Sequence, residues 1–228
     1  MDGRCPGAVE ITKERDARSP AVAGALLMLA GVSILMGIIT AEALFTVGYE
    51  TDANTISDLG STWQPGDVVR EPSATIFNLT MVATGILIAG GAWFLRRVVP
   101  GRAVPVAVAV LGVSVFAVGI FPGEEINGEP SSSGVHPIAA MLAFTSGGIA
   151  AVLSGRVTST PFRWIAVALG SIALLSLVLS GPLGDTSLGI GGIERWVAYP
   201  VVLWLVAFGG YLAAAGAGRE PPAAAADG

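Results

Sequence analysis

The sequence predicts an all-α integral membrane protein whose six transmembrane helices form three hairpins. Three observations predict this fold. Of the 228 residues, 53% are hydrophobic and 13% are charged, whereas soluble domains carry roughly 25% charged residues. Six stretches approach the roughly 20 apolar residues that a helix needs to cross a bilayer. Lysine and arginine are concentrated in alternate connections between these stretches.

The six predicted spans are separated by charged or turn-forming residues. They are Ala21–Val47, Ala74–Leu95, Val104–Phe121, Pro137–Leu153, Phe162–Ser180 and Trp196–Ala215. Residues 1–20 are charged, and the apolar run that follows exceeds the roughly 7–15 residues of a signal-peptide core. We therefore expect a cytoplasmic N-terminal tail, a first helix retained as a signal anchor, and a membrane domain over residues 21–215. The low-complexity residues 216–228 are expected to form a disordered C-terminal tail.

The distribution of positive charge predicts the orientation in the membrane. Ten of the twelve lysines and arginines lie in the two tails and in the second-to-third and fourth-to-fifth connections; the others are Arg70 and Arg195. Cytoplasmic segments carry the excess of these residues in membrane proteins. The sequence therefore predicts a multi-pass cell-membrane protein with both termini in the cytoplasm. The extracytoplasmic loops are then residues 48–73, 122–136 and 181–195, which are acidic.

The first extracytoplasmic loop is long, and this directs the search for a site to the outer ends of the helices. Connections longer than about 12–15 residues without secondary structure are uncommon unless they are functional or disordered. Residues 48–73 exceed that length. The inner connections, by contrast, are short and basic, as expected of simple topological connectors.

The segment NTISDLG, residues 54–60, places an amide, hydroxyls and a carboxylate beside the predicted first span. Asn54, Ser57 and Asp58 are therefore candidate site residues at the level of the lipid headgroups. A second interpretation is a capped turn, because Asn and Asp bond their own backbone and Gly60 permits a positive φ.

His136 is the only histidine in the chain and immediately precedes Pro137, a favourable first residue for a helix. The positive end of a helix dipole opposes protonation of a nearby imidazole. A neutral His136 could then serve as a general base. The alternative is a histidine that only caps the helix or lies at the membrane interface.

Glu194 and Arg195 lie in the segment GGIERWVAYP, which opens the predicted sixth helix. Glu194 suits a helix N-terminus, whereas Arg195 opposes the dipole there. Arginine can grip a carboxylate or phosphate at two points, so its candidate partners are Asp58, Asp185 or a lipid phosphate. Alternatively, the side chain of Arg195 extends to the outer interface.

Two polar residues lie deeper in the predicted spans. Glu42 precedes the outer end of the first span by about five residues, and Asn78 lies in the first turns of the second. A carboxylate in the hydrocarbon layer usually faces a bundle interior, a cavity or a partner. Glu42 joins the outward group if it is submerged and is merely interfacial if it is not.

Several familiar chemistries are not expected. The single histidine and single cysteine exclude ordinary zinc sites, and neither a phosphate-binding glycine loop with its lysine nor a G-x-S-x-G elbow is present. The outer acids could hold Ca²⁺ or Mg²⁺ by their chemistry, but no loop motif has the right spacing. A Ser57–His136–Asp58 arrangement is disfavoured because Ser57 and Asp58 are adjacent. We expect no cofactor, no metal and no nucleic-acid partner.

Several separated segments together resemble a known family. They are Tyr49, NTISDLG at 54–60, Pro72 followed by IFN at 76–78, GIFPGE at 119–124, His136 and GGIERWVAYP at 191–200. The chain resembles, from about Ala21 to Leu212, the bacterial and archaeal membrane proteins grouped as domain of unknown function 998. The resemblance implies six helices and no established activity. The matching polar positions are Asn54, Ser57, Asp58, Asn78, His136, Glu194 and Arg195.

Three functional hypotheses follow. The favoured one is an outward pocket at the headgroup level that binds or hydrolyses a lipid or lipid-linked substrate. Its catalytic candidates are Asp58, His136 and Glu194, and its binding candidates are Asn54, Ser57, Asn78 and Arg195. A small transporter would instead need polar residues at the midplane, such as Ser33, Thr84, Ser114 and Ser176. In the third hypothesis the protein is an assembly subunit whose outer polar residues form a structural lock, for example Asp58–Arg195. The lipid bilayer is the expected partner, and the oligomeric state is left open.

Overall fold

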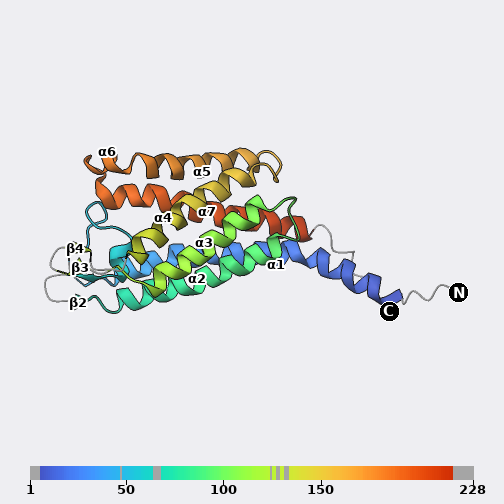
Figure 1. Ribbon diagram of the computed structural model, residues 1–228, viewed down its shortest axis with the longest axis horizontal. Helices are drawn as coiled ribbons and strands as arrows, with labels where there is room; N and C mark the ends of the chain where they lie inside the picture. Colours follow the sequence, from blue (N-terminus) through green and yellow to red (C-terminus); the bar gives the residue numbers. More distant parts are fainter. Residues whose placement is uncertain are drawn as a thin grey trace, which may run out of the picture.

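Helices make up most of the chain in the computed structural model, which describes residues 6–46, 48–63, 68–123, 125–126, 129–130 and 134–217. The helices are α1 (Pro6–Ala43), α2 (Ser73–Leu95), α3 (Ala103–Ile120), α4 (Val135–Ser154), α5 (Phe162–Val178), α6 (Ser180–Gly184) and α7 (Gly189–Ala217). Figure 1 shows all but α6 running along the long axis of the molecule, with the start of α1 and the end of α7 at the same end. The predicted all-α class is confirmed.

Five helices in the described part of the chain are long and apolar enough to cross a membrane, judged by length and composition. They are Ser19–Ala43, Ser73–Leu95, Ala103–Ile120, Val135–Ser154 and Gly189–Gly216. The remaining predicted span, Phe162–Ser180, corresponds to α5, which has 17 residues and ends at Val178, before the short α6. These apolar helices indicate a membrane-embedded protein.

The outer surface of the bundle supports the same conclusion. Leu79, Val113, Trp164 and Leu175 are each between 60% and 66% exposed. Large apolar surfaces are unfavourable in water and mark contact with a partner or with a membrane. Their distribution over three different helices, α2, α3 and α5, is typical of side chains that face lipid.

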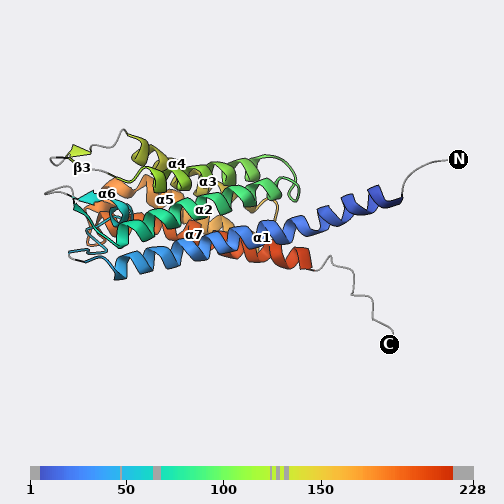
Figure 2. The same cartoon turned by 90° about the horizontal axis from the view of Figure 1, so that it is seen from below.

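The long helices form a closed ring. Each helix packs against its neighbour in the sequence, α5 packs against α7, and α7 packs against α1. Figure 2 shows α1 and α7 side by side, so the last helix closes the ring against the first. The core inside this ring includes Leu27, Ile38, Ile88, Trp204 and Phe208, all at most 1% exposed.

Glycines allow the helix backbones to touch at three places in the ring. A Cβ atom at Gly24 of α1 would lie 2.4 Å from the carbonyl oxygen of Gly209 in α7. A Cβ at Gly170 of α5 would lie 2.6 Å from the carbonyl oxygen of Gly148 in α4, and one at Gly112 of α3 would lie 2.7 Å from a backbone nitrogen of α2. Small residues of this kind permit the close packing that membrane helices rely on.

The connections with short secondary structure lie at one end of the ring (Figure 1). The 3₁₀ helix η1 (Ser57–Gly60) precedes strand β1 (Thr62–Trp63), which pairs antiparallel with β2 (Val68–Val69). A second antiparallel pair, β3 (Glu125–Ile126) and β4 (Glu129–Pro130), lies between α3 and α4.

Several predicted boundaries need correction. The last helix begins at Gly189 instead of Trp196, so much of the predicted loop 181–195 is helical. The first helix begins at Pro6, inside the predicted tail, and ends at Ala43. Val47, where the first span was predicted to end, lies outside the described residues, as do residues 1–5 and 218–228 of the predicted tails.

Candidate functional site

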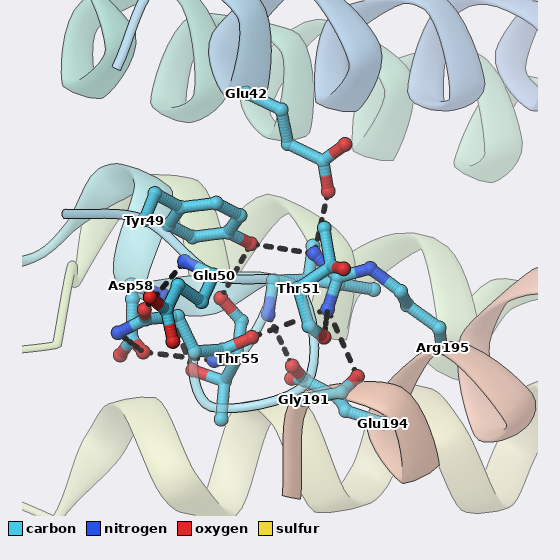
Figure 3. Close-up of polar contacts among 11 residues, drawn as sticks. Glu42, Tyr49, Glu50, Thr51, Thr55, Asp58, Gly191, Glu194 and Arg195 are labelled. Carbon is cyan, nitrogen blue, oxygen red and sulfur yellow. Dashed lines mark hydrogen bonds and ion pairs between the residues drawn. The ribbon is translucent and has the colours of Figure 1, made fainter. Parts of the chain in front are cut away.

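Arg195 joins three segments that are far apart in the sequence, and Figure 3 shows its contacts. Its Nη2 atom donates to Oε1 of Glu42 at 2.5 Å and to the hydroxyl oxygen of Tyr49 at 2.7 Å. Its Nη1 atom donates to three backbone carbonyls, those of Thr51 at 2.9 Å, Asn54 at 3.1 Å and Gly191 at 2.9 Å. We call Glu42, Tyr49 and Arg195, with the carbonyls that Arg195 binds, the arginine lock.

The two carboxylates predicted as partners of Arg195 were wrong. Its ion pair is with Glu42, and not with Asp58 or Asp185. The reason is the earlier start of α7, which places Arg195 in the second turn of the helix, beside the last turn of α1. The carboxylate and the three carbonyls supply the negative charge that a cation near a helix N-terminus needs.

Tyr49 belongs to the arginine lock. From the sequence it was identified only as one of the residues that resemble the family, and not as a site residue. Burial raises the pKa of Tyr49 above its ordinary value, although the neighbouring Arg195 acts in the opposite direction. The phenol therefore keeps its proton and donates it to the carbonyl oxygen of Thr55 at 2.9 Å. The hydroxyl thus links Arg195 to the start of the NTISDLG segment.

Asp58 is engaged locally, within the NTISDLG segment. The backbone N–H of Thr55 donates to Oδ2 of Asp58 at 2.8 Å, and the N–H of Asp58 donates to Oγ1 of Thr55 at 3.3 Å. This reciprocal pattern is a capping box, which satisfies the free N–H groups at a helix start. Asn54 adds a longer hydrogen bond to Asp58 at 3.4 Å and accepts one from the N–H of Glu50 at 2.9 Å. Both side chains therefore shape the loop.

Asn78 holds the end of the same segment against α2. Its Nδ2 donates to the carbonyl oxygen of Gly60 at 3.0 Å, and Ser73 donates to the carbonyl of Leu59 at 3.1 Å. Gly60 is required by this close approach, because a Cβ atom there would lie 2.4 Å from Oδ1 of Asn78. A positive φ, the reason suggested by the sequence, is absent at Gly60.

Glu194 binds the same loop as its neighbour Arg195, but through a backbone amide instead of backbone carbonyls. Its Oε2 accepts a hydrogen bond from the backbone N–H of Ile56, whereas Arg195 binds carbonyls just before that residue. The N-terminus of α7 adds a backbone contact, since the N–H of Gly191 donates to the carbonyl of Asp52 at 2.8 Å. Two adjacent side chains of opposite charge thus clamp residues 51–56 by their carbonyls and by an amide (Figure 3).

A cavity of about 90 Å³ lies behind this loop, inside the ring. Helices α1, α2, α3, α4 and α7 contribute its walls, and most of the lining is aliphatic or aromatic, for example Ile38, Met81 and Val115. Its polar lining consists of Ser57, His136 and Glu194. The predicted site residues thus separate into two groups: these three line the cavity, whereas Asn54, Asp58, Asn78 and Arg195 hold the loop that covers it.

His136 has one satisfied and one unsatisfied nitrogen. It is 6% exposed and lies in the first turn of α4. Its Nδ1 is 2.8 Å from the carbonyl oxygen of Phe121, and because a carbonyl only accepts, Nδ1 carries the proton of the neutral ring. Its Nε2 is buried and has no hydrogen-bond partner among the residues that the structure describes. Buried polar atoms are rarely left in this state, so a lone pair at the cavity wall needs an explanation.

The arrangement lacks the contacts of a nucleophilic triad. Nε2 of His136 bonds to neither Ser57 nor Glu194, both of which belong to the described part of the chain. Ser57 instead lies 3.1 Å from the hydroxyl of Thr55. Among the described residues, no group of three or more His, Cys, Asp or Glu side chains could hold a metal ion. The midplane residues Ser33, Thr84, Ser114 and Ser176 do not line the cavity.

Comparison with protein-family models gave a match that covers most of the chain. The model described as "Protein of unknown function (DUF998)" matches residues 28–211. Searches of curated proteins and of solved structures found no match. The matched range contains the loop, the arginine lock and the helices that line the cavity.

Proposed function

The chain belongs to the DUF998 family, and on that premise we propose that it is a cell-membrane protein that binds a neutral single-chain lipid. The apolar chain of the ligand occupies the cavity inside the ring. A hydroxyl group at the head of the ligand donates a hydrogen bond to Nε2 of His136. The clamped loop, residues 51–60, covers the bound head from the outer side.

The observation that carries this proposal is the unpartnered Nε2 of His136 at the wall of an otherwise apolar cavity. An unsatisfied buried acceptor costs about 1–3 kcal/mol. A ligand hydroxyl removes that cost and gives the ligand a fixed orientation. Ligand sites commonly combine apolar walls with a few placed polar groups in this way.

The charges at the cavity favour a neutral head over a phosphate. Glu194 lines the cavity, and the described residues of its lining include no lysine or arginine. Arg195, the predicted phosphate clamp, uses both of its terminal nitrogens on Glu42, Tyr49 and backbone carbonyls. An anionic head would find no cationic partner in this lining, whereas a hydroxyl can donate to the imidazole or to the carboxyl group.

The size of the cavity favours a single slender chain. A volume of about 90 Å³ is small beside the roughly 300–1,000 Å³ of pockets for drug-sized ligands. Such a space takes a segment of one chain, with the rest extending from its open side, and does not take two chains side by side. Long-chain alcohols and monoacylglycerols are the class of lipid that combines one chain with a hydroxyl head.

Binding is better supported than hydrolysis. Hydrolysis by a serine or by an activated water needs a base within hydrogen-bond reach of the nucleophile. Ser57 bonds to Thr55 instead of His136, and Asp58 is occupied by its capping box. The imidazole and Glu194 therefore act here as acceptors for the ligand head.

The proposal includes a sixth crossing of the membrane, by α5. A helix of 17 residues is at the lower limit of known spans, and the common end of α1 and α7 in Figure 1 agrees with an even number of crossings. The arginine-rich connections at that end support a cytoplasmic location for it. The loop, the lock and the mouth of the cavity are then extracytoplasmic.

The test measures binding of a long-chain alcohol to the purified full-length protein in detergent by native mass spectrometry. Wild type should bind the alcohol, and the matched alkane and fatty acid should bind at least tenfold more weakly. Ala143→Phe fills the cavity from its wall and should abolish binding, whereas Ala215→Phe, on an exposed part of α7, should not. His136→Phe should weaken binding about tenfold, as expected for the loss of one buried hydrogen bond. Equal binding by wild type and Ala143→Phe would contradict the proposal.

A further inference from the structure

Three arginines line an open groove at the end of the ring opposite to the arginine lock. The groove lies between the end of α2 and the start of α3 and has a volume of about 710 Å³. Arg96, Arg97 and Arg102 line it together with Trp93, and none of the described residues in its lining is acidic. The rest of its lining is apolar or glycine, including Ala92 and Val106.

The local structure brings the three guanidinium groups to one place. α2 ends at Leu95, and the chain turns back through Gly101, whose φ of +79° favours glycine. That turn makes Arg102 the residue preceding α3. The positive end of the α3 dipole therefore adds to the three side-chain charges.

Trp93 contacts Arg96 through the face of its ring, which leaves the N–H groups of Arg96 able to donate hydrogen bonds to a ligand. The guanidinium carbon of Arg96 lies 3.3 Å from the centre of the Trp93 ring, and that of Arg97 lies 5.9 Å from it. A guanidinium stacked flat on an indole keeps its N–H groups directed outward in its own plane. No ion pair to any of these arginines occurs within the described residues.

We propose that this groove binds the headgroup phosphate of an anionic phospholipid. The arginines offer bidentate donors to the phosphate oxygens, and the apolar floor accommodates the glycerol and the first part of an acyl chain. Basic pockets between transmembrane helices take anionic headgroups in this manner. The groove is separate from the cavity at His136. It is proposed to bind an anionic lipid, whereas the cavity is proposed to bind a neutral one.

The groove differs from the other basic connection of the same face. Arg156 and Arg163 lie between α4 and α5, and Arg163 donates its Nε hydrogen to the carbonyl of Thr158 at 3.3 Å. If the arginines served only to orient the helices, charge alone would matter and Arg96 would be equivalent to Arg156. Arg156→Gln is therefore a matched control for Arg96→Gln and Arg102→Gln.

The experiment titrates the purified full-length protein with phosphatidylglycerol or phosphatidylcholine of identical acyl chains and counts bound lipid by native mass spectrometry. Wild type should prefer phosphatidylglycerol at least tenfold. Arg96→Gln and Arg102→Gln should each weaken its binding about fivefold, the effect of one basic residue near an anionic lipid. Arg156→Gln should change it less than twofold. Arg96→Lys, which keeps the charge but loses the planar fork, should give an intermediate loss.

Three outcomes would overturn the inference. Equal affinity for the two lipids would show that the groove does not recognise the anionic headgroup. An equal loss of phosphatidylglycerol binding in Arg156→Gln would show that the lipid is attracted by the overall positive charge of this face and not by the groove. Full displacement of phosphatidylglycerol by millimolar inorganic phosphate would identify a free-anion site instead of a lipid site. The thermal unfolding temperature of each variant, measured without added lipid, shows that the changes come from binding and not from misfolding.

Discussion

Arg195 of α7 and Glu42 of α1 form an ion pair with 2.5 Å between Nη2 and Oε1, at the junction where the last helix meets the first. The side chains are 12% and 22% exposed, so water screens the pair only in part. The same guanidinium binds the loop that covers the cavity. Stability of the helix junction and placement of the loop therefore depend on one side chain.

Arg195→Gln is expected to lower the free energy of unfolding by about 2–4 kcal/mol, because it leaves the carboxylate of Glu42 without a counter-charge. Arg195→Lys should restore only part of this, since an ammonium group lacks the fork that reaches Glu42 and the carbonyls together. Thermal unfolding in detergent measures both effects. A double-mutant cycle with Glu42→Gln should give a coupling above about 1 kcal/mol. If the losses of unfolding free energy in the two single variants simply add in the double variant, the interaction between Arg195 and Glu42 does not itself stabilise the protein.

Tyr49 predicts a loss of stability in alkaline solution. Its pKa is raised in the folded protein by burial, so the folded state holds the phenolic proton more tightly than the unfolded state. The contribution of Tyr49 to the free energy of unfolding is therefore constant below the ordinary tyrosine pKa of about 10. It is lost as the pH rises above that value. Tyr49→Phe should remove this alkaline dependence while lowering stability at neutral pH by about 1–2 kcal/mol. An unchanged pH profile in Tyr49→Phe would assign the alkaline loss to other groups.

Asp58 is predicted to act through the loop and not on the ligand. Asp58→Ala removes the acceptor of the capping box and should cost about 1 kcal/mol of stability. Asp58→Asn keeps an acceptor oxygen and should cost less. Both variants should bind the long-chain alcohol within threefold of wild type in the native mass spectrometry assay. Abolished binding in a correctly folded Asp58→Asn variant would restore this residue to the site.

Gly191 marks the place where α7 touches the loop. A Cβ atom there would lie 2.0 Å from the carbonyl oxygen of Asn54, so Gly191→Ala must displace backbone and should cost about 1–3 kcal/mol. Gly210→Ala, in the same helix, meets nothing within 4 Å and should be neutral or stabilising, because alanine favours helix. Thermal unfolding of the two variants compares them directly. A similar loss in both would show that the contact with Asn54 is unimportant.

The membrane helices could be predicted from the sequence because hydropathy depends on composition along a single segment. α2, α3 and α4 begin and end within two residues of the predicted bounds. The start of α7 was missed because the glycines at 189, 191 and 192 disfavour a helix in isolation. In the folded chain, Gly189 and Gly191 let the loop approach the helix backbone closely, and this tertiary contact outweighs local propensity.

The candidate site could be predicted only as a set of residue types. The uniqueness of His136 was sufficient to single it out, and its burial beside a cavity agrees with that choice. The partner of Arg195 could not be predicted, because the choice between Glu42 and Asp58 depends on how α1 and α7 are aligned in space. The groove at Arg96 was overlooked because the positive-inside rule already accounted for its arginines.

The contact between Gly24 of α1 and Gly209 of α7 has a consequence for biosynthesis. A ribosome delivers α1 first and α7 last, and domains form in the order in which their parts emerge. Until α7 enters the bilayer, the glycine face of α1 has only lipid to contact, and Glu42 has no arginine beside it. The ring of helices therefore stays open until α7 is inserted. That last insertion closes the ring and gives Glu42 its ion-pair partner, Arg195.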